Sequence, residues 1–177
     1  KSPAVFDMGK LRWMNGEYIK RMDFEKFYER ALPFIKEAAG EKVDAKTVAE
    51  MVKSRIEIFP DICEHVAFFK AVPDYSLELY QNKKAKTNLE NSLSLLKEVL
   101  PLLEEEMDYS NDRLYALLQE FSAEKGYKTG FTMWPIRIAL SGKQMTPAGA
   151  TEILSVLGKE GSLKRIKTAI ERLETNA

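Results

Sequence analysis

Gly130-Phe-Thr-Met-Trp-Pro-Ile-Arg-Ile-Ala-Leu-Ser-Gly142 is the most informative stretch of the sequence. As a helix it would start at Thr132, acting as the N-cap, with Pro135 in the first turn, where a missing backbone N–H removes no hydrogen bond. Gly142 stands at the position that favours a left-handed end. At about 100° per residue two opposite faces are both apolar, so we expect other helices to enclose this one. These faces are formed by Phe131, Trp134 and Ile138 and by Met133, Ile136 and Leu140.

Arg137 is the only charged residue in this apolar stretch. An unpaired guanidinium in such a place would be costly, because the charge would lose its hydration without compensation. Arg137 must therefore have either an acidic partner inside the protein or an anionic or aromatic partner outside it. The isolated helix leaves both alternatives open.

Composition excludes several classes of protein. The 177 residues suffice for one large domain or two small ones, and 27 basic against 27 acidic side chains argue against a wholesale polyanion binder. A local basic groove remains compatible with this balance. The single cysteine, Cys63, excludes an intrachain disulfide framework and indicates a reducing compartment, which we take to be the cytoplasm. His65 lies nearby, but the further ligands that a zinc site needs are missing.

The sequence gives no sign of a membrane span or of a secretory signal. No apolar run approaches the roughly 20 residues that a membrane-spanning helix requires. The first residues, Lys1-Ser2-Pro3-Ala4, lack a charged leader followed by an apolar segment, and we interpret them as a cut inside a longer chain. Pro3 favours an extended start.

Helical spacing and capping signals recur along the whole chain, whereas no stretch alternates with period two over the length of a strand. We therefore predict an all-α fold with two packed helical units joined near residue 81. Lys83, Lys84 and Lys86 would start the long helix, where their charges oppose the helix dipole. The expected helices span residues 7–14, 17–22, 23–39, 44–58, 76–80, 83–106, 110–125, 132–142 and 146–157. A further one starts at Pro60 and contains Ile62, Val66 and Phe69, and a last one starts at residue 161.

The chain lacks the residue patterns of the common catalytic sites. It has no glycine-rich phosphate loop, no paired metal ligands and no histidine placed with a nucleophile. We therefore expect neither catalysis nor a bound cofactor in this chain.

Two groups of motifs resemble the bacterial glutamyl-tRNA synthetases. Ser2-Pro-Ala-Val-Phe-Asp7 and Lys10-Leu-Arg-Trp-Met-Asn-Gly16 are similar to the segment that follows the catalytic domain in that family. Trp134-Pro-Ile-Arg-Ile-Ala-Leu-Ser-Gly142, then Thr146-Pro147 and Glu152-Ile-Leu through Leu157-Gly-Lys-Glu160, resemble its C-terminal anticodon-binding domain. Their order and separation fit, so the resemblance covers essentially all of the chain.

The resemblance implies a C-terminal fragment of such an enzyme. Residues 1–25 would end the stem-contact region, 26–81 would form a small helical domain, and 82–177 would form the class I synthetase anticodon-binding helical bundle. The family's H-I-G-H and K-M-S-K-S elements, which hold ATP, are absent here. The parent enzyme would ligate glutamate to tRNA with ATP and magnesium, while this part would supply tRNA selection.

The same resemblance implies the partners. They are tRNA(Glu), with acceptance of tRNA(Gln) left open, and the missing catalytic domain of the same chain. We expect a monomer in the cytoplasm.

The resemblance also assigns candidate site residues. Arg137 matches an arginine that contacts anticodon bases, a task suited to a planar guanidinium that stacks and hydrogen-bonds. Thr146 and Pro147 match the loop-to-helix start beside the anticodon, although simple helix capping would explain them equally. Arg55 matches more weakly an arginine that reads the last anticodon base, and a surface or ion-paired role is the alternative. Candidate phosphate contacts are Lys83, Lys84 and Lys86, and the two tryptophans, Trp13 and Trp134, are interpreted as core residues.

A different class of function competes with this one. An all-α adaptor that binds a partner helix and no nucleic acid would use the same aromatic residues. A concave face that collects arginines and lysines would support RNA binding, whereas an apolar groove would support the adaptor. A free-standing enzyme would require ATP turnover by this chain, which we do not expect.

Overall fold

The computed structural model describes residues 7–176 and divides into two compact units, Lys1–Lys70 and Ala71–Ala177. The predicted all-α class is confirmed, since the described residues form helices and only one isolated bridge, between Asn82 and Thr87. The extended start expected for residues 1–6 lies outside the described residues. The domain limits 1–25, 26–81 and 82–177 remain predictions; the compact units divide after Lys70.

The first unit begins with helices that aspartate side chains cap. Asp7, Asp23 and Asp44 each accept a hydrogen bond from a backbone N–H in the first turn of the helix that follows, as expected. The break predicted at Asn15-Gly16 is wrong, because α1 continues through Gly16, which is buried against the backbone of Glu57. The capped helices are α1 (Met8–Arg21), α2 (Phe24–Ala39) and α3 (Ala45–Val52).

The core of the first unit lies where α2 packs against α3 and α4 (Asp61–Lys70). The helix expected from Asp44 to Ile58 ends earlier, at Val52. Asp61 accounts for the turn that replaces its end, since its carboxylate accepts hydrogen bonds from the backbone N–H groups of Glu57 and Ile58, each 3.1 Å away. The largest buried side chains of this unit include Ile19, Phe27, Ile35, Ile56, Ile62 and Phe68.

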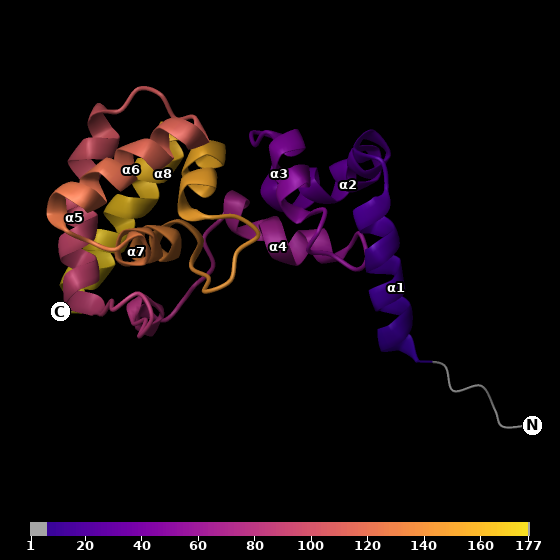
Figure 1. Ribbon diagram of the computed structural model, residues 1–177, viewed down its shortest axis with the longest axis horizontal. Coiled ribbons are helices and arrows are strands. Elements are labelled where there is room, and N and C mark those ends of the chain that lie inside the picture. The colour runs from indigo at the N-terminus through magenta and orange to yellow at the C-terminus, as the bar shows by residue number, and fades with distance from the viewer. Residues whose placement is uncertain (1–6, 177) are drawn as a thin grey trace, which may run out of the picture. The chain divides into compact units, whose positions relative to one another are not determined.

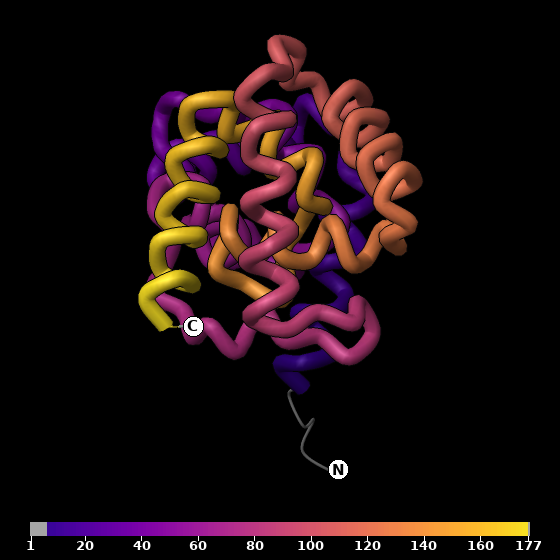
Figure 2. The backbone as a smooth tube through the Cα atoms, turned by 90° about the vertical axis from the view of Figure 1, so that its left-hand side faces the viewer, coloured from indigo at the N-terminus to yellow at the C-terminus, as the bar shows by residue number. Residues whose placement is uncertain are grey.

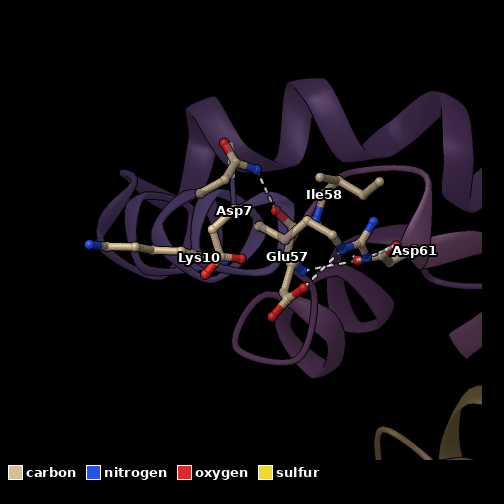
Figure 3. Close-up of polar contacts among 7 residues, drawn as sticks. Asp7, Lys10, Glu57, Ile58 and Asp61 are labelled. Atoms are coloured by element: carbon tan, nitrogen blue, oxygen red, sulfur yellow. Dashed lines mark hydrogen bonds and ion pairs between the residues drawn. The ribbon is translucent and has the colours of Figure 1, made fainter. Parts of the chain in front are cut away.

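Ion pairs attach α1 to this turn (Figure 3). Arg12 donates from Nε to Glu57 and from Nη2 to Asp61, each at 3.0 Å. Asn15 adds a hydrogen bond to the carbonyl of Glu57. The arginine on α1 therefore has its charge compensated within the fold.

The second unit is a helical bundle in which α8 (Ala150–Thr175) packs against α5 (Leu89–Glu105), α6 (Asn111–Lys125) and α7 (Thr129–Ser141). Figure 2 shows α5 running beside the C-terminal part of α8. Within α8 the backbone departs from helical geometry at Gly158, where φ is 67°. This kink agrees with the helix end expected at Gly158. Fully buried side chains from each helix form the core, among them Leu95, Leu103, Leu114, Leu118, Ile136, Leu140, Leu154 and Ile166.

Segment 71–81 packs into the second unit. It contains the short 3₁₀ helix η1 (Leu77–Tyr80). The indole N–H of Trp134 donates to the carbonyl of Leu79 at 2.9 Å, and the buried Tyr80 shares a hydroxyl–hydroxyl contact of 3.0 Å with Tyr75. Arg172 on α8 donates to the carbonyl of Tyr75 at 2.9 Å.

The lysine cluster does not lie on a helix, contrary to the sequence prediction. Asn82 and Thr87 exchange two backbone hydrogen bonds, of 3.0 and 3.1 Å, and close a turn that carries Lys83, Lys84 and Lys86 (Figure 1). We call residues 82–87 the lysine turn. The helix α5 starts only at Leu89, capped by Asn88, so the lysines do not oppose its dipole. Among the described residues, no helix has the length and apolar character needed to cross a bilayer.

Candidate nucleic-acid interface

The central helix α7 begins three residues earlier than predicted. It starts at Thr129, so Pro135 lies inside the helix and not in its first turn. Thr132 is not the N-cap but is buried, with its hydroxyl 2.7 Å from that of Ser122 on α6. The left-handed end at Gly142 is confirmed by a φ of 63° and by a 2.8 Å hydrogen bond from its N–H to the carbonyl of Ile138.

One side of α7 lines a cavity of about 620 Å³. This side carries Gly130, Met133, Trp134 and Arg137, at the i, i+3, i+4 and i+7 spacing of a single helix face. The remaining faces of α7 pack into the bundle core, as its many buried residues show. The other walls come from the lysine turn, from the first turns of α6 and from the start of α8: Asn82, Lys84, Ala85, Asn111, Tyr115, Gly149, Ala150, Thr151 and Glu152.

Arg137 enters this cavity without an acidic partner among the described residues. Its Nη2 donates to the carbonyl of Gln144 at 2.9 Å, and its Nε is buried with no hydrogen-bond partner. The guanidinium carbon lies 4.7 Å from the centre of the Trp134 ring. Burial lowers the pKa of the Arg137 guanidinium, because the charged form has lost part of its hydration. The charge is thus partly desolvated and not neutralised.

Trp134 is a wall of the cavity as well as a packing residue, which corrects its interpretation as core alone. It is only partly buried, and its ring supports the guanidinium while its N–H is fixed by Leu79. A cation above an indole face is attracted by the negative charge of the ring face. The expectation of a core position is wrong for Trp13, whose side chain on α1 is 59% exposed.

The start of α8 lies at the cavity, but it is not formed by Thr146 and Pro147. The helix begins at Ala150, and Thr146 uses its hydroxyl to donate to the carbonyl of Ala148 at 2.7 Å instead of capping a helix. Pro147 is buried. Glu152 accepts a 2.7 Å hydrogen bond from the N–H of Gly149 and places a carboxylate at the helix N-terminus, where it competes with any bound phosphate.

The polar groups of the cavity are oriented by their neighbours. The side-chain oxygen of Asn111 accepts a 2.8 Å hydrogen bond from the hydroxyl of Thr151, which leaves its amide N–H groups to donate. The side-chain oxygen of Asn82 accepts a 2.9 Å hydrogen bond from the N–H of Ala85, so the amide N–H groups of Asn82 are also left to donate. The cavity is therefore rich in hydrogen-bond donors.

The lysine turn separates two hollows that share Asn82. Lys84 lines the cavity beside Arg137, whereas Lys83 and Lys86 line a second hollow, also of about 620 Å³, together with Gln144. All three lysines are exposed. The lysine turn thus places positive charge at a concave face of the second unit, where Glu78 in the second hollow and Glu152 in the cavity are the acidic lining residues.

Arg55 lies in the first unit, in the turn after α3. Its side chain is exposed and makes no ion pair or hydrogen bond with the described residues. Its role in RNA binding stays a prediction. The described residues also contain no cluster of three or more His, Cys, Asp or Glu that could hold a metal ion.

Sequence reasoning found Arg137 but missed most of its surroundings. The repeat of Gly130, Met133, Trp134 and Arg137 was visible and could have indicated a cavity-facing side of the helix. Asn82, Asn111 and Tyr115 come from distant segments, and no local pattern connects them with α7.

The protein-family model described as anticodon binding domain matches residues 26–170 of this chain. Among curated proteins, the chain is 54% identical over 176 residues to the glutamate–tRNA ligase of Lachnoclostridium phytofermentans. It is 45% identical over 175 residues to that of Clostridium acetobutylicum. These alignments cover 99% and 98% of this chain but 36% of each relative, so the chain spans about a third of their length.

Comparison with solved structures supports the fold. A glutamate–tRNA ligase from Elizabethkingia meningosepticum, solved with its amino acid, superposes with a TM-score of 0.81 at 24% sequence identity. The superposition covers 95% of this chain and 33% of that one. At this identity the match extends to the architecture alone.

Proposed function

The chain belongs to the anticodon-binding domain family, and from this premise we propose that its second unit binds the anticodon loop of a tRNA. The similarity to glutamate–tRNA ligases, which the sequence motifs also indicated, points to tRNA(Glu) as the cognate RNA. None of the comparisons supports the alternative of a protein-binding adaptor.

The environment of Arg137 carries this proposal. A guanidinium that is half-buried, rests on an aromatic ring and has only a carbonyl partner retains a charge and a donor to offer. Arg12 in the first unit has two carboxylate partners, whereas the partners of Arg137 carry no negative charge, so Arg137 can still pair with an external anion. A splayed RNA base supplies both a π surface and hydrogen-bond acceptors for such a group.

The two hollows suggest a division of tasks. The cavity of about 620 Å³ beside Trp134 has the size of a small-ligand pocket and can accept an unstacked base. Glu152 makes the same cavity unfavourable for a phosphate group. Lys83 and Lys86, on the other side of the lysine turn, are then placed to contact the phosphates that flank the base.

The activity of the longer protein follows as part of the proposal. It would ligate glutamate to tRNA with ATP and magnesium bound outside this chain, which itself would only select the RNA. Acceptance of tRNA(Gln) is not assigned, and Arg55 remains a candidate for reading an anticodon base. We propose that the protein acts as a monomer in the cytoplasm, which sedimentation velocity and fractionation would check.

Titration of the chain with a tRNA(Glu) anticodon stem-loop tests the proposal. Arg137→Ala should weaken binding by about 1–3 kcal/mol, the range found when stacking contacts to bases are removed. Arg137→Lys keeps the charge but loses the planar fork, so it should recover only part of the affinity. Lys83→Ala should weaken all stem-loops alike and reduce the slope of log K against log salt by about 0.7.

Three controls make the result interpretable. Arg12→Ala removes an arginine whose partners are both protein carboxylates, and it should leave the affinity unchanged. A stem-loop with an unrelated anticodon should bind more weakly than the cognate one. The proposal would be refuted if the two stem-loops bound with equal affinity and if Arg137→Ala bound each of them as tightly as wild type does. The cavity would then read no base.

A further inference from the structure

The lysine turn contains a residue in an unfavourable backbone conformation. Among the described residues, Lys86 is the only one other than glycine with a positive φ, at 60°. In this left-handed region the Cβ of an L-amino acid lies too close to the following carbonyl oxygen, so glycine is the usual occupant. Hairpin loops often need one such residue before the chain pairs again. A lysine at this position therefore lowers the stability of the fold.

Hydrogen bonds on both sides hold Lys86 in this conformation. The two backbone hydrogen bonds between Asn82 and Thr87 close the turn around it. The carbonyl of Lys86 accepts a 3.1 Å hydrogen bond from the side-chain amide of Asn91 in the first turn of α5. The hydroxyl of Thr87, the next residue, donates to the carbonyl of Tyr80 at 2.7 Å. A strained residue persists only where its surroundings fix it in this way.

The turn also concentrates positive charge that the fold does not compensate. Lys83, Lys84 and Lys86 lie within four residues, and none of them makes an ion pair with the described residues, whereas Lys125 pairs with a glutamate. Glu78 is the acidic residue of the second hollow, and it is exposed, so solvent screens its charge. Repulsion between the three ammonium groups therefore adds to the backbone strain.

We propose that lysine occupies this left-handed position because its ammonium group binds a phosphate of the RNA, and that the strained turn fixes the direction of the side chain before the RNA arrives. The inference rests on the proposed function and adds that the chain keeps a less stable turn in order to keep a charge at the second hollow. A turn that is already ordered loses less entropy on binding. Lys83 and Lys84 do not have a positive φ, so the loss of stability is specific to Lys86.

Alanine and glycine at two positions of the turn test the strain without RNA. Both substitutions remove the lysine charge, and they differ from each other only in the Cβ. Lys86→Gly should melt about 1–4 °C above Lys86→Ala, because relief of the left-handed strain outweighs the additional chain entropy that glycine loses on folding. Lys83→Gly should instead melt about 1–4 °C below Lys83→Ala, because only the entropy acts there. Thermal unfolding of the 177-residue chain, followed by circular dichroism, measures both differences.

Titration of the same variants with the tRNA(Glu) anticodon stem-loop at low salt tests the phosphate contact. Lys86→Ala and Lys86→Gly should both bind about two- to fivefold more weakly than wild type, the range expected for one exposed ion pair. Each should reduce the slope of log K against log salt by about 0.7. Lys86→Arg keeps both the charge and the Cβ, so its melting temperature and its affinity should stay close to those of wild type.

Each measurement can overturn the inference separately from the proposed function. If Lys86→Gly melts at or below Lys86→Ala, the position is not strained and the inference fails, while RNA binding is unaffected by that result. If Lys86→Gly is the more stable variant but binds the stem-loop as tightly as wild type, the lysine makes no phosphate contact and the inference also fails. The effect of Arg137→Ala then still decides the proposed function. If the wild-type chain binds no stem-loop, both fail together.

Discussion

Arg12 in the first unit and Arg137 in the second both sit on helices, yet their surroundings are opposite. Arg12 donates to Glu57 and Asp61, and hydrogen bonds to Asp61 and then Glu57 raise the pKa of its guanidinium. Arg137 faces a tryptophan ring and a carbonyl oxygen, and burial lowers its pKa. The first environment compensates the positive charge, whereas the second removes water from it and supplies no negative charge.

This difference separates an arginine used for folding from one available for binding. Helical periodicity alone leaves two explanations of Arg137 open, an internal ion pair and a partner outside the protein. Among the described residues no carboxylate pairs with it, so the first explanation does not hold. The partners that the structure does show are the Trp134 ring and the carbonyl of Gln144, and an anionic or aromatic partner outside the protein stays a proposal.

The largest effect should come from breaking the turn that frames Arg137. At Gly142 the backbone has φ +63°, and an added Cβ would lie 2.7 Å from a ring carbon of Tyr75. Gly142→Ala should therefore destabilise the protein by about 2–5 kcal/mol, combining left-handed strain with overpacking. Thermal and urea unfolding would measure the loss. The turn also brings the carbonyl of Gln144 to Arg137, so RNA affinity should fall with stability.

Gly126 provides the matched control for this prediction. It ends α6 with φ +69°, but nothing lies within 4 Å of a Cβ added there. Gly126→Ala should therefore cost only the backbone strain, about 1–2 kcal/mol. Equal losses at the two glycines would mean that contact with Tyr75 contributes nothing and that the frame around Arg137 is looser than the structure indicates.

A smaller effect should follow when the support of Arg137 is weakened and the arginine is kept. Trp134→Phe removes the indole N–H that donates to Leu79 and leaves a weaker ring below the guanidinium. We expect a loss of stability of about 1 kcal/mol and a loss of RNA affinity of about 0.5–2 kcal/mol. Calorimetry measures both the stability and the RNA affinity. Trp13→Phe, in the first unit, is the control and should change neither as much as Trp134→Phe. Unchanged affinity in Trp134→Phe would show that the ring does not position Arg137.

The fold class was accessible from sequence because it rests on local signals. Asp7, Asp23 and Asp44 cap helices as their position predicts, and Gly142 ends α7 in the expected left-handed conformation. Errors arose where a distant contact outweighs a local preference. Gly16 does not break α1, because the helix packs there against Glu57.

The site was only partly predictable for the same reason. Arg137 was identifiable as a lone charge in an apolar helix, but its carbonyl partner and the lysine turn depend on tertiary contacts. The bridge between Asn82 and Thr87 turns Lys83, Lys84 and Lys86 away from the helix that their charge pattern suggested. Thr146-Pro147 looks like a helix start, yet α8 begins at Ala150 because Thr146 bonds within its own turn.

The smallest expected effect is a pH-dependent loss of stability at Asp61, the carboxylate beside Arg12. It distinguishes Arg12 from Arg137, because of these two arginines only Arg12 has carboxylate partners among the described residues. Burial alone would raise the pKa of Asp61, but the N–H groups of Ile58 and Glu57 and the guanidinium of Arg12 together hold it below its usual value. A depressed pKa means that the stabilisation is present above the unfolded value of about 3.9 and is lost as the pH falls through the folded value.

Asp61→Asn should therefore be less stable than wild type at neutral pH by about 1 kcal/mol or less, because the site is partly exposed and solvent screens it. Urea unfolding from about pH 7 to about pH 2.5 should show this difference shrinking below about pH 4, where the wild-type carboxylate becomes protonated. The stability difference between wild type and Arg137→Lys should stay constant over the same range, since no carboxylate accepts a hydrogen bond from Arg137. A pH-dependent difference at Arg137 would reveal an acidic partner and would remove the contrast between the two arginines.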